Sequence, residues 1–101
     1  MKMEIGMSQQ LDPQLTQRIT AILEDVLSHG LADIEGRDLV NDRFAVLGVN
    51  SVDYLEFILN LEHHLAIDIP DEAMMDPALN SVRVWSAYLS EHAGDLATNA
   101  A

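Results

Sequence analysis

Apolar residues recur at intervals of three and four along the first part of the chain, which is the spacing of one face of an α-helix. Asp12 and Pro13 form a typical helix start, an N-cap residue followed by proline at the first helical position. Apolar positions follow at helical spacing until Gly30, a glycine suited to the helix end: Leu15, Ile19, Ile22, Leu23 and Val26. The pattern therefore predicts a helix between Asp12 and Gly30.

A second helix is predicted from Asn50 to about Leu65, a segment without glycine or proline. At about 100° of rotation per residue, one apolar set lies on the side of Tyr54 and predicts the core stripe: Phe57, Ile58, Leu61 and Leu65. Another apolar set gathers on a different side, between Glu56 and Glu62: Val52, Leu55 and Leu59. Because the core needs only one stripe, this second strip is either a wide buried face or a docking surface.

The remaining segments complete an all-α pattern. A short helical turn is predicted from Pro70 through Met75. A last helix is predicted to begin near Ser81 and to end before Gly94, with one apolar side: Val82, Trp85, Tyr88 and Leu89. Residues 31–50 lack periodicity, so they form a long connection that is functional or partly helical. We expect a small bundle of three longer helices and one short helix with a long first loop.

Composition narrows the possible functions. The 101 residues contain 5 Lys and Arg against 17 Asp and Glu, a formal net charge of −12, which disfavours nucleic acid and anionic membranes as partners. Cysteine is absent, which excludes disulfides and thiolate metal sites. No apolar run reaches the about 20 residues that span a bilayer, so we expect a soluble, cytoplasmic monomer. The expected domain covers residues 11–93, between flexible ends at 1–10 and 94–101, and the native start is open among Met1, Met3 and Met7.

The candidate chemistry lies at the start of the second predicted helix. No Lys or Arg occurs between Phe44 and Val82, while seven carboxylates do. This favours an acidic partner surface around the second strip, although most charge runs are simply solvated faces. Ser51 alone would most often be a helix cap, and the sequence offers no base to make it a nucleophile. His63 and His64 are adjacent on a helix and point about 100° apart, which disfavours a shared metal ion.

The run from Leu47 to Asp53, with Glu56, Leu61, Glu62 and the segment Ile69 to Glu72, resembles the acyl carrier proteins, a family of acidic helical carriers. The resemblance is close between Phe44 and Glu72 and looser in the first and last helices. It implies that Ser51 receives a 4′-phosphopantetheine arm from coenzyme A through a phosphopantetheinyl transferase. The thiol of that arm would hold acyl groups as thioesters for fatty-acid, polyketide or related lipid synthesis.

The resemblance also implies where partners dock. Loading and synthase enzymes with basic patches would meet the acidic side chains of Asp53, Glu56 and Glu62 and the apolar ones of Val52, Leu55 and Leu59. The sequence departs from the family pattern at Asn50, where an aspartate is usual, and at Val52, where a leucine is usual. Asn50 thus removes one carboxylate that the transferase normally meets, which indicates a specialised carrier.

Two other functions remain open from the sequence. One is an aminoacyl or peptidyl carrier, since such carriers share the serine motif. The other is an acidic helical adaptor that uses the same surface without a prosthetic group. A hydrolase acting through Ser51 is disfavoured because no base is paired with it.

Overall fold

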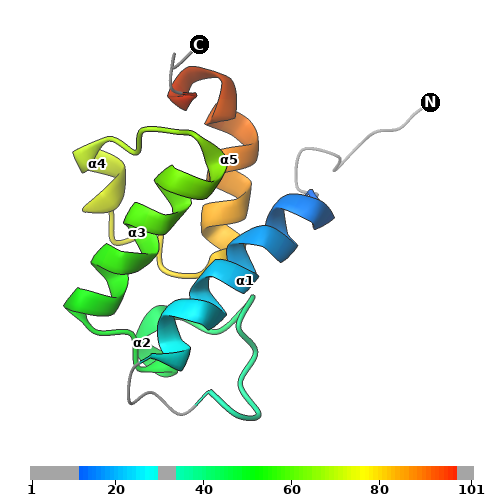
Figure 1. Ribbon diagram of the computed structural model, residues 1–101, viewed down its shortest axis with the longest axis vertical. Coiled ribbons are helices and arrows are strands. Elements are labelled where there is room, and N and C mark those ends of the chain that lie inside the picture. The colour runs from blue at the N-terminus through cyan, green and yellow to red at the C-terminus, as the bar shows by residue number, and fades with distance from the viewer. Residues whose placement is uncertain (1–11, 30–33, 98–101) are drawn as a thin grey trace.

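The computed structural model describes residues 12–29 and 34–97. Within these ranges the chain forms five helices: α1 (Pro13–Ser28), α2 (Phe44–Leu47), α3 (Ser51–Leu65), α4 (Asp71–Met74) and α5 (Val82–Leu96). The three longer helices pack against one another, and α2 and α4 lie in the connections before and after α3 (Figure 1). The all-α prediction is confirmed, and α2 adds a second short helix that periodicity did not predict.

The helix starts follow the capping residues in the sequence. The Asp12 carboxylate accepts hydrogen bonds from the Gln14 and Leu15 N–H groups at 3.0 and 3.3 Å. Ser81 does the same for α5, since its Oγ accepts from the Val84 N–H at 3.2 Å. These bonds satisfy donors that have no partner inside the helix. The start predicted at Asp12 is therefore confirmed, whereas Gly30 lies outside the described residues.

An aromatic cluster forms the centre of the core. The Phe57 ring lies 5.4 Å from the Phe44 ring and 6.4 Å from the Trp85 ring, centroid to centroid, in edge-to-face arrangements. Phe57 and Trp85 are completely buried. Most residues of the three predicted apolar faces are buried around them: Ile19, Ile22, Leu23, Val26, Ile58, Leu61, Val82 and Leu89. The predicted stripes are thus the faces with which α1, α3 and α5 meet.

The long connection before α3 is held by hydrogen bonds rather than by a periodic apolar face. The Phe44 N–H donates to the Asn80 carbonyl at 2.8 Å, and the Arg83 N–H donates to the Val40 carbonyl at 2.9 Å. Asp38 closes a turn in this connection. The Asn41 side-chain amide donates to its carboxylate and lowers the Asp38 pKa, with smaller contributions from backbone N–H groups. The hydrogen bonds of the Phe44 and Arg83 N–H groups tie the connection to the start of α5.

The helix end predicted before Gly94 is wrong, because α5 continues to Leu96. The Leu96 carbonyl accepts a hydrogen bond from the Asp68 N–H at 2.8 Å, and Ile67 and Ala97 form an isolated antiparallel bridge. These contacts with the segment after α3 hold the last turn in place. The segment 94–97 is therefore part of the fold and not of a tail, while residues 1–10 and 98–101 lie outside the described ranges.

Candidate functional site

Ser51 is the first residue of α3, and its side chain is exposed. The preceding residue, Asn50, caps the helix: its side chain accepts from the Asp53 N–H at 2.8 Å, and the Asp53 carboxylate accepts from the Asn50 N–H at 3.2 Å. This reciprocal capping box satisfies the donors that Ser51 could otherwise have capped. Within the described part of the chain the Ser51 hydroxyl makes no hydrogen bond, so it is not the helix cap.

A tight turn brings the chain from α2 into Ser51. Gly48 ends α2 with φ 81°, in the left-handed region where glycine is favoured. The Val49 N–H donates back to the Phe44 carbonyl at 3.0 Å. Phe44 is itself buried against Phe57. The start of α3 is thereby anchored to the core, which fixes the position of the exposed hydroxyl.

The second apolar strip of the sequence is a surface and not a wide buried face. Val52, Leu55 and Leu59 are 65%, 50% and 62% exposed, whereas Phe57 and Leu61 on the core side are fully buried. Leu55 follows Ser51 by four residues, so the two side chains lie on one side of α3 a turn apart. Val46 on α2 and Met75 directly after α4 are two more exposed apolar residues, and α2 and α4 are too short for a periodic pattern to have indicated this exposure.

The three acidic side chains predicted for docking have different environments. Glu56 is exposed on α3. Asp53 is only 9% exposed, and its carboxylate accepts the Asn50 N–H in the capping box, while its role as an acidic partner contact stays a prediction. Glu62 is half-buried, and one of its oxygens accepts a hydrogen bond from the Ile69 N–H at 2.8 Å. The Asp53 carboxylate therefore holds the start of α3, and the Glu62 carboxylate holds the segment that follows α3.

Side chains of α3 also fix the segment that carries α4. The Tyr54 hydroxyl donates to the Met74 carbonyl at 2.8 Å, and Glu62 holds the Ile69 N–H on the other side of α4. Burial raises the pKa of the Tyr54 hydroxyl. The nearby Trp85 indole N–H lowers this pKa, although it lies outside hydrogen-bond geometry, and the Asp76 carboxylate raises the pKa further. Tyr54 therefore remains a protonated donor near neutral pH.

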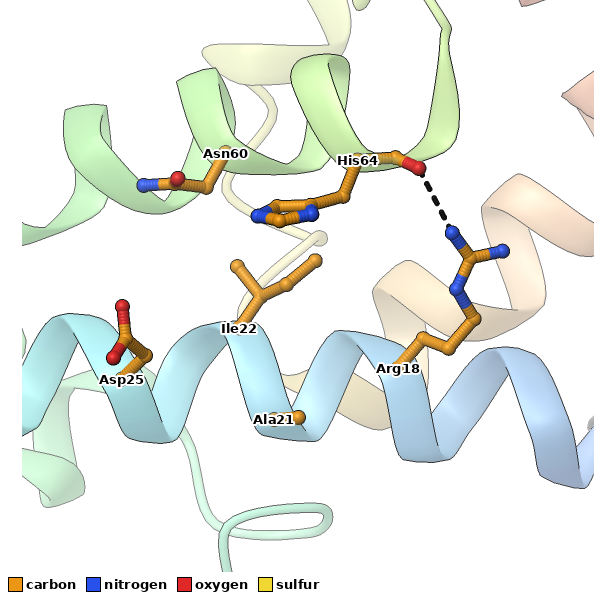
Figure 2. Close-up of a pocket in the computed structure, with 6 residues that line it drawn as sticks. All are labelled: Arg18, Ala21, Ile22, Asp25, Asn60 and His64. Carbon is orange, nitrogen blue, oxygen red and sulfur yellow. Dashed lines mark hydrogen bonds between the residues drawn. The ribbon is translucent and has the colours of Figure 1, made fainter.

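A groove of about 340 Å³ lies between α1 and α3 (Figure 2). Its centre is formed by Ile22 below the His64 ring, and Arg18 donates to the His64 carbonyl at 2.8 Å. Asn60, on the same wall, follows Ser51 by nine residues, a rotation of about 180° around the helix. The groove and the serine thus lie on opposite sides of α3, and the groove is not part of the site at Ser51.

His63 and His64 are neighbours near the end of α3. The His63 and His64 rings stand edge to face with centroids 5.3 Å apart. Among residues 12–29 and 34–97, no three His, Cys, Asp or Glu side chains are grouped as ligands for an ion. In the same ranges, no helix combines the length and apolarity needed to cross a membrane.

The family model for the phosphopantetheine attachment site matches residues 17–89, a range that runs from α1 into α5 and includes Ser51. The chain belongs to this family. No curated protein and no solved structure gives a significant match. Members of this family carry phosphopantetheine and are not themselves catalysts, so the family match makes this chain a phosphopantetheine carrier. The resemblance found in the sequence is confirmed for the family, not for the cargo.

The residues at the start of α3 fit this prosthetic group. A phosphodiester on Ser51 would lie at a helix N-terminus, where backbone N–H groups without helical partners and the positive end of the helix dipole favour an anion. The neighbouring Asn50 is neutral, so it adds no repulsion to that anion. Neither the exposed hydroxyl nor the turn before it would have to be rearranged to accept the arm.

Proposed function

We propose that Ser51 carries the 4′-phosphopantetheine arm and that the chain presents acyl intermediates on it to enzymes of fatty-acid, polyketide or related lipid synthesis. The observation that supports Ser51 most strongly is its hydroxyl, exposed and without a hydrogen bond at the start of α3 while Asn50 caps the helix. In the modification, the Ser51 oxygen bonds to the phosphorus that carries the pantetheine in coenzyme A. The adenosine bisphosphate leaves, and the hydroxyl proton goes to a base of the transferase.

The chain itself positions the arm and supplies the surface beside it. The arm contributes a thiol, which forms the thioester, to a protein that has no cysteine. The capping box keeps the start of α3 rigid, and the buried Phe44 holds the preceding turn. A partner that covers Leu55 is one helical turn from Ser51, so its active site can receive the arm directly. The chain accordingly acts as a substrate and partner of enzymes.

The cargo is tested by loading the holo protein. Holo chain would be incubated separately with an acyl-loading enzyme and with an aminoacyl-activating enzyme, and intact mass would be recorded before and after hydroxylamine. An acyl adduct that hydroxylamine removes supports the proposed function, because thioesters are cleaved by this nucleophile. Loading by the aminoacyl enzyme alone would show the alternative, an aminoacyl or peptidyl carrier. A Ser51→Ala chain, treated identically, is the control for adducts formed elsewhere.

Asn50→Asp is expected to speed modification by a transferase that serves ordinary fatty-acid carriers. The substitution restores the carboxylate that such a transferase meets. A hydrogen bond to a charged group contributes about 1.5–3 kcal/mol, whereas the neutral amide of Asn50 offers only a weaker one. Aspartate also caps a helix about as well as asparagine, so thermal stability should hardly change. The measurement is the rate of holo formation at low and moderate salt, with the larger gain expected at low salt.

Gln17→Glu provides a matched control, since it adds the same charge at an exposed position on α1. It should leave the rate close to that of the natural chain. Equal rates for Asn50→Asp and the natural chain at both salt concentrations would show that Asn50 has no part in the choice of transferase.

A further inference from the structure

The groove between α1 and α3, on the far side of α3 from Ser51, has opposite charges at its two ends (Figure 2). Arg18 and His64 line one end, and Asp25 lines the other. Arg18 and Asp25 are exposed and lie seven residues apart on α1, about 10 Å along its axis. Within the described residues neither of them forms an ion pair. The groove thus offers one free charge of each sign.

The exposed side of α1 between these two charges is small and apolar. Ala21 is exposed and lies three residues after Arg18 and four before Asp25, so the three side chains share one side of the helix. Ile22 lies next to it in the floor of the groove. Because the distance between packed helices depends on the side chains at the contact, alanine lets another helix approach closely.

Two copies of this face are complementary when their α1 helices run antiparallel. A two-fold axis that passes between Ala21 and Ile22 is three and a half residues from Arg18 and equally far from Asp25. The axis therefore places Arg18 of each copy opposite Asp25 of the other. A two-fold interface uses the same patch on both copies, so both ion pairs form together.

We propose that a second copy of the chain docks on this groove, with the two α1 helices antiparallel around Ala21 and two ion pairs between Arg18 and Asp25. Any other partner would need two charges at the matching spacing, whereas a copy has that spacing by symmetry. Ser51 lies on the opposite side of α3, so both serines stay accessible in the dimer. The monomer expected from the sequence is then one side of a weak equilibrium.

The net charge of the chain sets how weak this equilibrium is. Each copy carries a formal charge of −12, so the two copies repel each other overall. At physiological salt, exposed charges more than about 8 Å apart are largely screened, which leaves the charges at the interface itself. These are one Arg18 and one Asp25 from each copy. A face of little more than one helix is also small for a stable complex, so we expect a Kd of about 0.1–1 mM.

Sedimentation equilibrium of the apo chain at physiological salt measures this association. Arg18→Glu and Asp25→Lys should each weaken the dimer about tenfold or more, because each turns both ion pairs into like-charge contacts. The two substitutions change the net charge in opposite directions, so an effect of overall repulsion would have opposite signs. An equimolar mixture of the two variants should restore the natural affinity, since both pairs re-form between unlike chains. Glu72→Lys, at an exposed position on α4, is the matched control and should not weaken the dimer.

Crosslinking tests the antiparallel arrangement. The natural chain has no cysteine, so a single introduced thiol reports on one contact. Two Ala21→Cys chains bring their thiols together at the two-fold axis and should form a disulfide-linked dimer with a thiol oxidant. Ala87→Cys, at an exposed position on α5, is the control for random collisions and should stay largely monomeric over the same time.

Three results would overturn the proposal, provided that thermal unfolding shows each variant folded. The first is a natural chain that sediments as a monomer up to about 2 mM, well above the expected Kd. The second is a dimer that Asp25→Lys strengthens or leaves unchanged. The third is a mixture of the two charge variants that associates no better than either alone. None of these measurements uses coenzyme A or a transferase, so they are independent of whether Ser51 accepts the arm.

Discussion

Ser51→Ala is expected to fold normally and to gain no phosphopantetheinyl group. Alanine removes the only oxygen that the proposal assigns as acceptor, so the loss should be complete rather than partial. Substituting a capping serine costs about 1 kcal/mol, but here the side chain of Asn50 caps α3. The free energy of unfolding should therefore change by less than about 0.5 kcal/mol. Intact mass after incubation with coenzyme A and a transferase checks the first part, and thermal unfolding checks the second.

Ser90→Ala is the matched control for this substitution. Ser90 is also exposed and helical, but it lies within α5. The control should be modified at the rate of the natural chain. Modification of the Ser51→Ala chain would show that another residue accepts the arm, and an unfolded Ser51→Ala chain would contradict the capping role of Asn50.

Phe57→Ala is expected to destabilise the protein by about 3–5 kcal/mol, the usual cost of removing a fully buried phenylalanine. Phe57 is 0% exposed and joins the Phe44 ring to the Trp85 ring, so alanine leaves a cavity between α2, α3 and α5. A domain of this size has a stability of about 5–15 kcal/mol, so much of it would be lost. Urea denaturation followed by circular dichroism gives the difference.

Leu55→Ala, two residues earlier on the exposed side, is the natural comparison. It should change the free energy of unfolding by less than about 0.5 kcal/mol, because half of that side chain is already in water. Similar losses of unfolding free energy for the two substitutions would show that the second apolar strip, which includes Leu55, is part of the core. Such a result would remove the basis for a docking surface.

The long helices could be predicted from the sequence because each repeats its apolar positions often enough to define a face. α3 begins at Ser51 and ends at Leu65, as the pattern indicated, and its second strip is exposed. The periodic pattern also separated the core residue Phe57 from its exposed neighbour Leu55. What the pattern left open was whether the second strip is buried, since that depends on what the remaining helices cover.

Other features depend on contacts between distant segments, which a local pattern does not contain. α2 has four residues, too few for a period, and is positioned by the bond from Phe44 to Asn80. Gly94 suggests a helix end, but the hydrogen bond from the Asp68 N–H to the Leu96 carbonyl holds α5 in helical form as far as Leu96. The acidic charge of Asp53 favours a docking role in the sequence, yet its carboxylate is used by the capping box.

Peptide mass spectrometry of the natural chain tests the role of Ser51 most directly. The apo protein would be incubated with coenzyme A and a phosphopantetheinyl transferase, digested, and fragmented to locate the added mass. One phosphopantetheinyl group per chain, on Ser51, is the predicted result. An unmodified chain under conditions that convert a known carrier, or a group located on any other residue, would contradict it.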